Sequence, residues 1–172
     1  MTDTPTIIAG FALPASSPLF LAEVGVHGAF ALVAVAAGAG AMFSAKRAGR
    51  HPWFGTVYIG AMLGAFAVAA ALAAERWAQD WPLALLGALS IAAAIAGRQS
   101  RRRLRPGWPR RHIAGMGASY ILMLTAFYVD NGHALPIWRD LPPLAWWLTP
   151  SLVGLPLIVY ALLHQPLARA KD

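Results

Sequence analysis

Two histidines, His51 and His112, occupy similar places in the sequence, each directly after an arginine and directly before an apolar stretch. Neutral imidazole nitrogens are axial ligands of b-type haem, and two histidines on facing helices would supply both ligands of one iron. The same position suits a structural histidine that caps a helix or contacts lipid phosphate. The sequence leaves both interpretations open, a haem b site and a structural role.

Glu23 and His27 lie four residues apart in the first apolar stretch, so a helix places them one turn apart on one face. An ionisable residue in the hydrocarbon costs roughly 2.5 to 3.5 kcal/mol near its centre and usually marks a functional site. The pair predicts a proton or ion pathway. The alternative is a Glu23 solvated near the outer surface or bonded to His27, with His27 a neutral histidine hydrogen-bonded across the bundle.

A third polar group follows the fourth apolar stretch, where Asp130, Asn131, Gly132 and His133 precede Trp138. This mixture of polar and aromatic side chains is a candidate outer site. Asn and Gly also tolerate the left-handed conformation at helix ends, and we expect a turn here. The chain has no cysteine, serine-triad pattern, glycine-rich phosphate loop or HExxH, so we predict no catalytic residue and no metal site other than a haem.

The composition around these residues is that of a chain embedded in lipid. Hydrophobic residues make up 58% of the 172 residues and charged residues 12%, and the mean hydropathy is +0.55. A water-soluble domain could not bury that much apolar surface. The net charge of +7 would favour nucleic acid in a soluble protein, but here the basic residues flank apolar segments. We therefore expect anionic lipid head groups as partners, and no nucleic acid.

Five segments are long and apolar enough to cross about 30 Å of hydrocarbon as helices. They cover approximately residues 18–43, 53–74, 81–97, 113–129 and 144–163. Residues 1–17 carry Asp3 and two prolines in place of the basic start of a secretory signal, and we interpret them as an outer N-terminal segment. The sequence thus predicts an all-α membrane protein with a single integral-membrane domain over residues 1–172.

Basic residues gather in alternate gaps between these segments. Twelve of the 14 lie in three places: Lys46, Arg47 and Arg50 in the first gap, seven arginines within residues 98–111, and Arg169 and Lys171 in the tail. Short loops rich in Lys and Arg stay in the cytoplasm. The N-terminus is therefore expected outside and the C-terminus inside, with the arginine-rich loops against anionic lipid.

Residues 50–68 align without gaps with residues 111–129, and Arg, His, Met, Leu, Ala, Phe and Val recur in register. A true duplication would relate helices one and two to helices three and four by a parallel repeat about the membrane normal. His51 and His112 would then share one depth, with Tyr58 and Tyr120 two turns further in. The alternative is coincidence in a chain of low complexity.

Gly60 and Gly64 form a GxxxG pattern, which lets helix backbones approach closely in lipid. The pattern joins either two helices of one chain or two chains. A homo-oligomer and a membrane partner subunit are therefore both open.

The stretches HIAGMGASYILMLTAFYVDNG at residues 112–132 and RHPWFGTVYIGAM at residues 50–62 resemble the signature region of a family of small multipass bacterial membrane proteins, domain of unknown function 2306. The resemblance extends over about residues 26–163. It implies a compact helical bundle in the bacterial inner membrane. It implies no activity, cofactor or catalytic residue.

From these observations we expect a polytopic inner-membrane protein that is not an enzyme and acts as a scaffold or accessory membrane subunit. The first alternative is a b-type cytochrome that transfers electrons through a haem held by His51 and His112. The second is a small transporter or proton pathway that uses Glu23 and His27.

Overall fold

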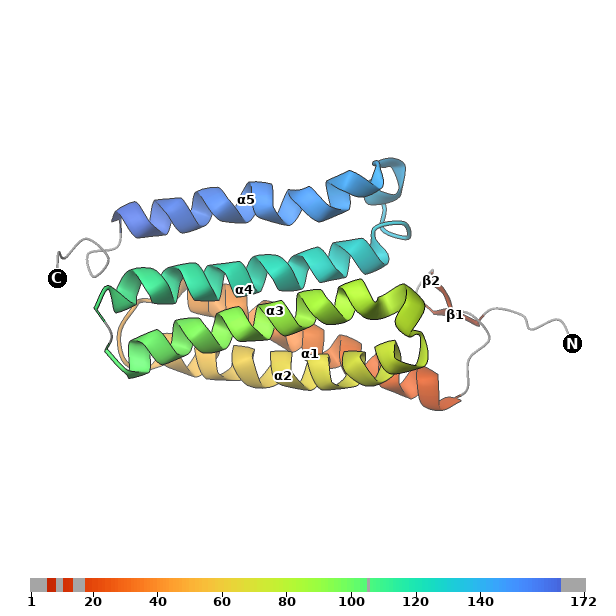
Figure 1. Cartoon of the computed structure of the whole chain (residues 1–172), viewed down its shortest axis with the longest axis horizontal. Coiled ribbons are helices and arrows are strands. Elements are labelled where there is room, and N and C mark those ends of the chain that lie inside the picture. Colours follow the sequence, from red (N-terminus) through yellow and green to blue (C-terminus); the bar gives the residue numbers. More distant parts are fainter. Residues whose placement is uncertain (1–5, 9–10, 14–17, 105, 165–172) are drawn as a thin grey trace, which may run out of the picture. The chain divides into compact units, whose positions relative to one another are not determined.

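The computed structural model describes residues 6–8, 11–13, 18–104 and 106–164. Two short strands, β1 (Thr6–Ile8) and β2 (Phe11–Leu13), pair antiparallel with Ile8 opposite Phe11. The helices, in chain order, are α1 (Pro18–Phe43), α2 (Arg50–Glu75), α3 (Trp77–Arg102), α4 (Trp108–Asn131) and α5 (Pro143–His164), with a 3₁₀ turn η1 (Trp138–Asp140) before α5 (Figure 1). Most of the predicted outer segment 1–17, and Arg105, Arg169 and Lys171 among the basic residues, lie outside the described residues.

Each of these helices is long and apolar enough to cross a membrane. The shortest, α5, has 22 residues, and at about 1.5 Å per residue it still exceeds the thickness of the hydrocarbon. The prediction of an all-α membrane protein with five spans is confirmed. The strand pair ahead of α1 is an addition that the sequence did not suggest.

α3 and α4 extend well beyond the predicted segments 81–97 and 113–129. Hydropathy ends a span at the first charged residues, whereas backbone hydrogen bonding continues through them until the chain turns. As a consequence, five of the seven arginines expected in a loop lie on helices: Arg98, Arg101, Arg102, Arg110 and Arg111.

The chain divides into two compact units, and the division falls between Ala84 and Leu85 within α3. In the first unit α1 and α2 lie side by side (Figure 1). A Cβ on Gly40 would lie 2.7 Å from the Phe54 ring, and one on Gly64 would lie 2.8 Å from the Phe30 ring. The contact moves back along α1, from Gly40 to Phe30, as it moves forward along α2, from Phe54 to Gly64, so the two helices are antiparallel.

The second unit contains α4, α5 and α3 from Leu85 onward. α3 and α4 touch backbone to backbone, since a Cβ on Gly115 would lie 2.8 Å from the Cα of Gly97. α4 and α5 meet where Gly117 accommodates the side chain of Ile158, 2.6 Å from the position of a Cβ. Small residues thus set the helix spacing in this unit, as expected in lipid.

The two glycines of the GxxxG pattern, Gly60 and Gly64, have different surroundings. Gly64 is covered by Phe30 of α1, whereas a Cβ on Gly60 would meet no described atom within 4 Å. Gly64 therefore serves the α1–α2 contact within the chain. A homo-oligomer through Gly60 stays a prediction.

Candidate functional site

His51 lies in the first turn of α2 and binds the end of α1. Its Nδ1 donates a hydrogen bond to the carbonyl oxygen of Ala41 at 2.9 Å. The Nζ of Lys46 donates to the same oxygen at 2.8 Å and to the carbonyl of Met42. The last carbonyls of a helix have no partner within the helix, so the turn after α1 is closed by two side chains that supply donors.

His112 lies in the second turn of α4 and binds α3 in a similar way. Its Nδ1 donates to the carbonyl oxygen of Gly97 at 3.1 Å, and the Oγ of Ser100 donates to that oxygen at 2.8 Å. Both histidines thus connect the start of one helix to a carbonyl of the preceding helix. We refer to the two bonds, His51–Ala41 and His112–Gly97, as the histidine–carbonyl clasps.

The clasps fix the tautomer of each ring. A neutral imidazole that donates from Nδ1 carries its basic lone pair on Nε2. This tautomer is usual for a metal-bound histidine and also for a purely structural one. His51 belongs to the first unit and His112 to the second, so a haem shared between them stays a prediction.

His27 also bonds to the backbone of a neighbouring helix. Its Nδ1 donates to the carbonyl oxygen of Ala65 in α2 at 2.9 Å, and the side chain is half-buried. This is the interhelical bond expected for a neutral structural histidine. Glu23, one turn earlier and also half-buried, makes no hydrogen bond or ion pair with the described residues.

Tyr58 and Tyr120, the tyrosines expected two turns beyond the histidines, differ in their surroundings. Tyr58 is buried in α2, with 1% of its surface exposed, whereas Tyr120 in α4 is only half-buried. The same difference holds for Met62, which is buried, and Met123, which is not. The gap-free alignment pairs Tyr58 with Ser119, which is also buried. Burial therefore matches at some aligned positions and differs at others, and the repeat stays a prediction.

The polar segment after α4 contains the expected helix end, with a different backbone. α4 ends at Asn131, but Gly132 is right-handed (φ −55°, ψ −37°), so the left-handed conformation that we expected is wrong for this glycine. Glycine fits here because the Trp146 ring would lie 2.6 Å from a Cβ. Asp130 and His133 are exposed to the surroundings.

Trp138 holds the loop between α4 and α5 in place. Its ring lies 4.3 Å from the Tyr128 ring, centroid to centroid, and its carbonyl oxygen accepts a hydrogen bond from Nε1 of Trp146 at 3.0 Å. The neighbouring Ile137 has a positive φ of 72°, which is unusual for a β-branched residue. The loop is thus built from aromatic contacts more than from the polar residues that suggested a site.

A buried polar pair between α3 and α4 was missed from the sequence. The Oγ of Ser90 donates to the carbonyl oxygen of Ser119 at 2.8 Å, and both serines are at most 1% exposed. The available signal was a serine inside an otherwise apolar span, because small polar residues bond across helices in lipid. Within the described part of the chain, every buried side-chain nitrogen or oxygen has a hydrogen-bond partner.

No group of three or more His, Asp or Glu side chains among the described residues gathers to hold a metal ion. Among the described residues, five helices are long and apolar enough to cross a membrane, which defines a multipass α-helical membrane protein. No family model, curated protein or solved structure matches the chain. The resemblance to domain of unknown function 2306 stays a prediction.

Proposed function

We propose that the protein is a non-enzymatic bundle of the bacterial inner membrane that acts as a scaffold or accessory subunit. The histidine–carbonyl clasps are the observation that carries this proposal. The two histidines best suited to chemistry by sequence are bonded to backbone carbonyls of the preceding helices, where they tie consecutive helices together. The satisfied interior polar atoms support the same reading, because complete polar networks rigidify a structure.

The proposal includes an orientation, with the N-terminus outside and the C-terminus inside. It is supported by the concentration of Lys and Arg around the α1–α2 and α3–α4 turns. The α2–α3 turn, with Glu75, Arg76 and Asp80, carries a mixed charge instead. Basic turns on alternate faces are what the positive-inside rule describes.

The test is made on the full chain, purified in mild detergent. We expect no Soret band in its visible spectrum. We also expect that His51→Ala and His112→Ala each lower the free energy of unfolding by about 0.5 to 1.5 kcal/mol, the usual net value of one hydrogen bond. His164→Ala is the matched control, because His164 is exposed and its Nδ1 bonds to Tyr160 within its own helix.

A b-type cytochrome is the second candidate, favoured by one feature of the clasps. An Nδ1 proton donated to a backbone carbonyl is the outer bond that commonly orients a metal-ligating histidine. Bound haem would supply one-electron transfer. A purified protein with a Soret band that is lost in both His51→Ala and His112→Ala would replace the scaffold by the cytochrome.

A further inference from the structure

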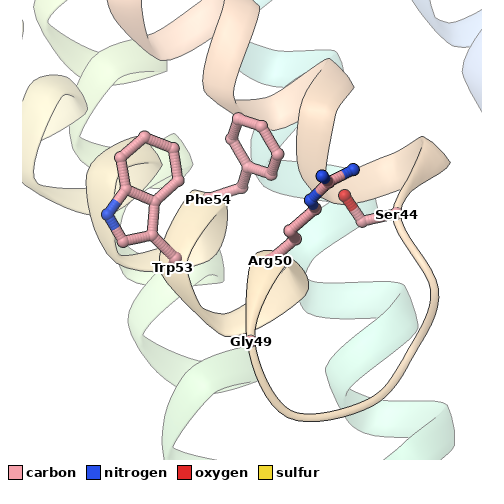
Figure 2. Close-up of a pocket in the computed structure, with 5 residues that line it drawn as sticks. All are labelled: Ser44, Gly49, Arg50, Trp53 and Phe54. Atoms are coloured by element: carbon pink, nitrogen blue, oxygen red, sulfur yellow. The ribbon is translucent and has the colours of Figure 1, made fainter.

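A pocket lies beside the α1–α2 turn, within the first unit. It has a volume of about 570 Å³ and is lined by Ser44, Gly49, Arg50, Trp53 and Phe54 (Figure 2). Small-molecule sites usually measure about 300 to 1,000 Å³, so the pocket is large enough for a small polar group with its apolar attachment. We refer to it as the turn pocket.

Contacts within the chain hold the walls of the turn pocket in place. The Phe54 ring packs against Gly40, where it would lie 2.7 Å from a Cβ. Trp53 meets Phe54 edge to face, with ring centroids 4.9 Å apart. The Ser44 hydroxyl donates to the carbonyl of Gly40. A ligand would therefore meet a preformed surface.

Arg50 is the cation of this pocket. Its side chain is exposed, and its guanidinium makes no hydrogen bond or ion pair with the described residues. Figure 2 shows the guanidinium beside the Ser44 hydroxyl, with Trp53 and Phe54 forming the neighbouring wall. The two aromatic rings and the guanidinium offer an apolar surface next to a bidentate donor of hydrogen bonds.

Lys46, four residues earlier, already donates its hydrogen bonds to the end of α1. Its ammonium donates to the carbonyls of Ala41 and Met42 at the end of α1. Burial lowers the pKa of this amine from its ordinary value of 10.5, because it is partly removed from water. Of these two cations, Arg50 is therefore the one available to an anion.

The position of the pocket along the chain indicates which anion it meets. The turn joins two candidate spans, so the pocket lies at the level where the hydrocarbon gives way to the head groups. Trp53 is 61% exposed, and tryptophan prefers that level of the bilayer. No lining residue is acidic, whereas Arg47 adds a positive charge to the turn. A zwitterionic head group would place its ammonium beside these cations and be repelled, so the charges favour an anionic head group.

We propose that the turn pocket binds the phosphate of one anionic phospholipid of the phosphatidylglycerol type. The Arg50 guanidinium pairs with two phosphate oxygens, which is the geometry that arginine favours. Trp53 and Phe54 pack against the glycerol and the first carbons of the acyl chains. The inference requires the α1–α2 turn to lie at a membrane face and is independent of the scaffold role.

Native mass spectrometry of the full chain in detergent tests the inference. The protein is mixed with equimolar phosphatidylglycerol and phosphatidylcholine that carry the same acyl chains, and the lipid retained by each protein is counted. We expect one retained phosphatidylglycerol in preference to phosphatidylcholine. Arg50→Gln should weaken this retention about tenfold, the size expected for losing one charge-assisted pair.

Arg47→Gln is the matched control, because it removes the same charge from the same turn without touching the pocket lining. Equal losses in Arg50→Gln and Arg47→Gln would overturn the site and leave only the net charge of the turn. Equal retention of the two lipids would also overturn it. Displacement of the lipid by millimolar inorganic phosphate, followed by a bound phosphate, would assign the pocket to the free ion instead.

A fluorescence measurement locates the lipid independently. Phosphatidylglycerol brominated on its acyl chains should quench Trp53 more strongly than brominated phosphatidylcholine does. The contribution of Trp53 is obtained by subtracting the signal of Trp53→Phe, and Arg50→Gln should remove the preference. Far-UV circular dichroism shows that each variant is folded, so a preference unchanged in folded Arg50→Gln would refute the pairing.

Discussion

A methyl group at Gly115 provides the sharpest test of how the second unit is built. In Gly115→Ala the new Cβ would lie 2.8 Å from the carbonyl oxygen of Ala93 and from the Cα of Gly97. These are backbone atoms, so no side-chain rotation can make room. Carbon atoms in contact rest about 3.5 to 4.0 Å apart, and α3 and α4 must therefore separate by roughly 1 Å.

The expected loss follows from that displacement. Overpacking a closely packed site costs about 1 to 3 kcal/mol. For a chain of 172 residues, each kcal/mol corresponds to roughly 2 to 4 °C in Tm. The Tm of Gly115→Ala should fall by about 2 to 12 °C. The hydrogen bond from His112 to the carbonyl of Gly97, at 3.1 Å, also joins α3 to α4, so it should lengthen when the two helices separate.

The assay is thermal unfolding in one detergent, followed by far-UV circular dichroism. Gly60→Ala is the matched control, because its new Cβ meets no described atom within 4 Å and alanine is the better helix former. Its Tm should not fall. Gly97→Ala should lower the Tm as well, and the double variant should lose less than the sum, since the helices are already apart. Equal Tm values for Gly115→Ala and Gly60→Ala would refute the backbone contact.

Three further outcomes are expected. Ser90→Ala removes the bond to Ser119 and should cost about 0.6 kcal/mol, the average for a polar contact between helices in lipid, as measured by unfolding in detergent; an unchanged stability would contradict the bond. Glu23→Gln should accumulate in the membrane fraction at the wild-type level, as measured by immunoblot, because Glu23 is half-buried near the start of α1, where the free-energy cost of a carboxylate in the membrane is small. A large loss would identify Glu23 as a buried structural partner. A cysteine at His133 should react with an impermeant thiol reagent in intact cells and one at Arg103 should not, both sites being exposed; the reverse pattern would invert the orientation.

The spans could be predicted from the sequence because the length of an apolar run is a property of the sequence itself. The first predicted segment, residues 18–43, coincides with α1. Helix ends were harder, since hydropathy falls at Arg98 whereas α3 continues to Arg102. Where the backbone turns depends on contacts that form only in the folded chain.

The sequence predicted the histidines of the candidate site but not their hydrogen-bond partners. His51 and His112 stood out by their repeated setting, but their partners are the carbonyls of Ala41 and Gly97, and a backbone acceptor leaves no mark in the sequence. The GxxxG spacing identified Gly64 correctly as a contact. It missed the Gly97–Gly115 contact, because those glycines lie on different helices and have no fixed spacing.

The connection between α2 and α3 has a consequence for how the chain enters the bilayer. α2 ends at Glu75 and α3 begins at Trp77, so Arg76 is the whole connection. Its Nε lies 3.9 Å from the Asp80 carboxylate. Because one connecting residue gives the two helices no slack, we expect them to cross the bilayer together as a pair. In the proposed orientation only the few polar side chains of the α2–α3 turn cross the membrane. Arg50 at the start of α2 and Arg102 at the end of α3 keep the other ends of both helices on the cytoplasmic side.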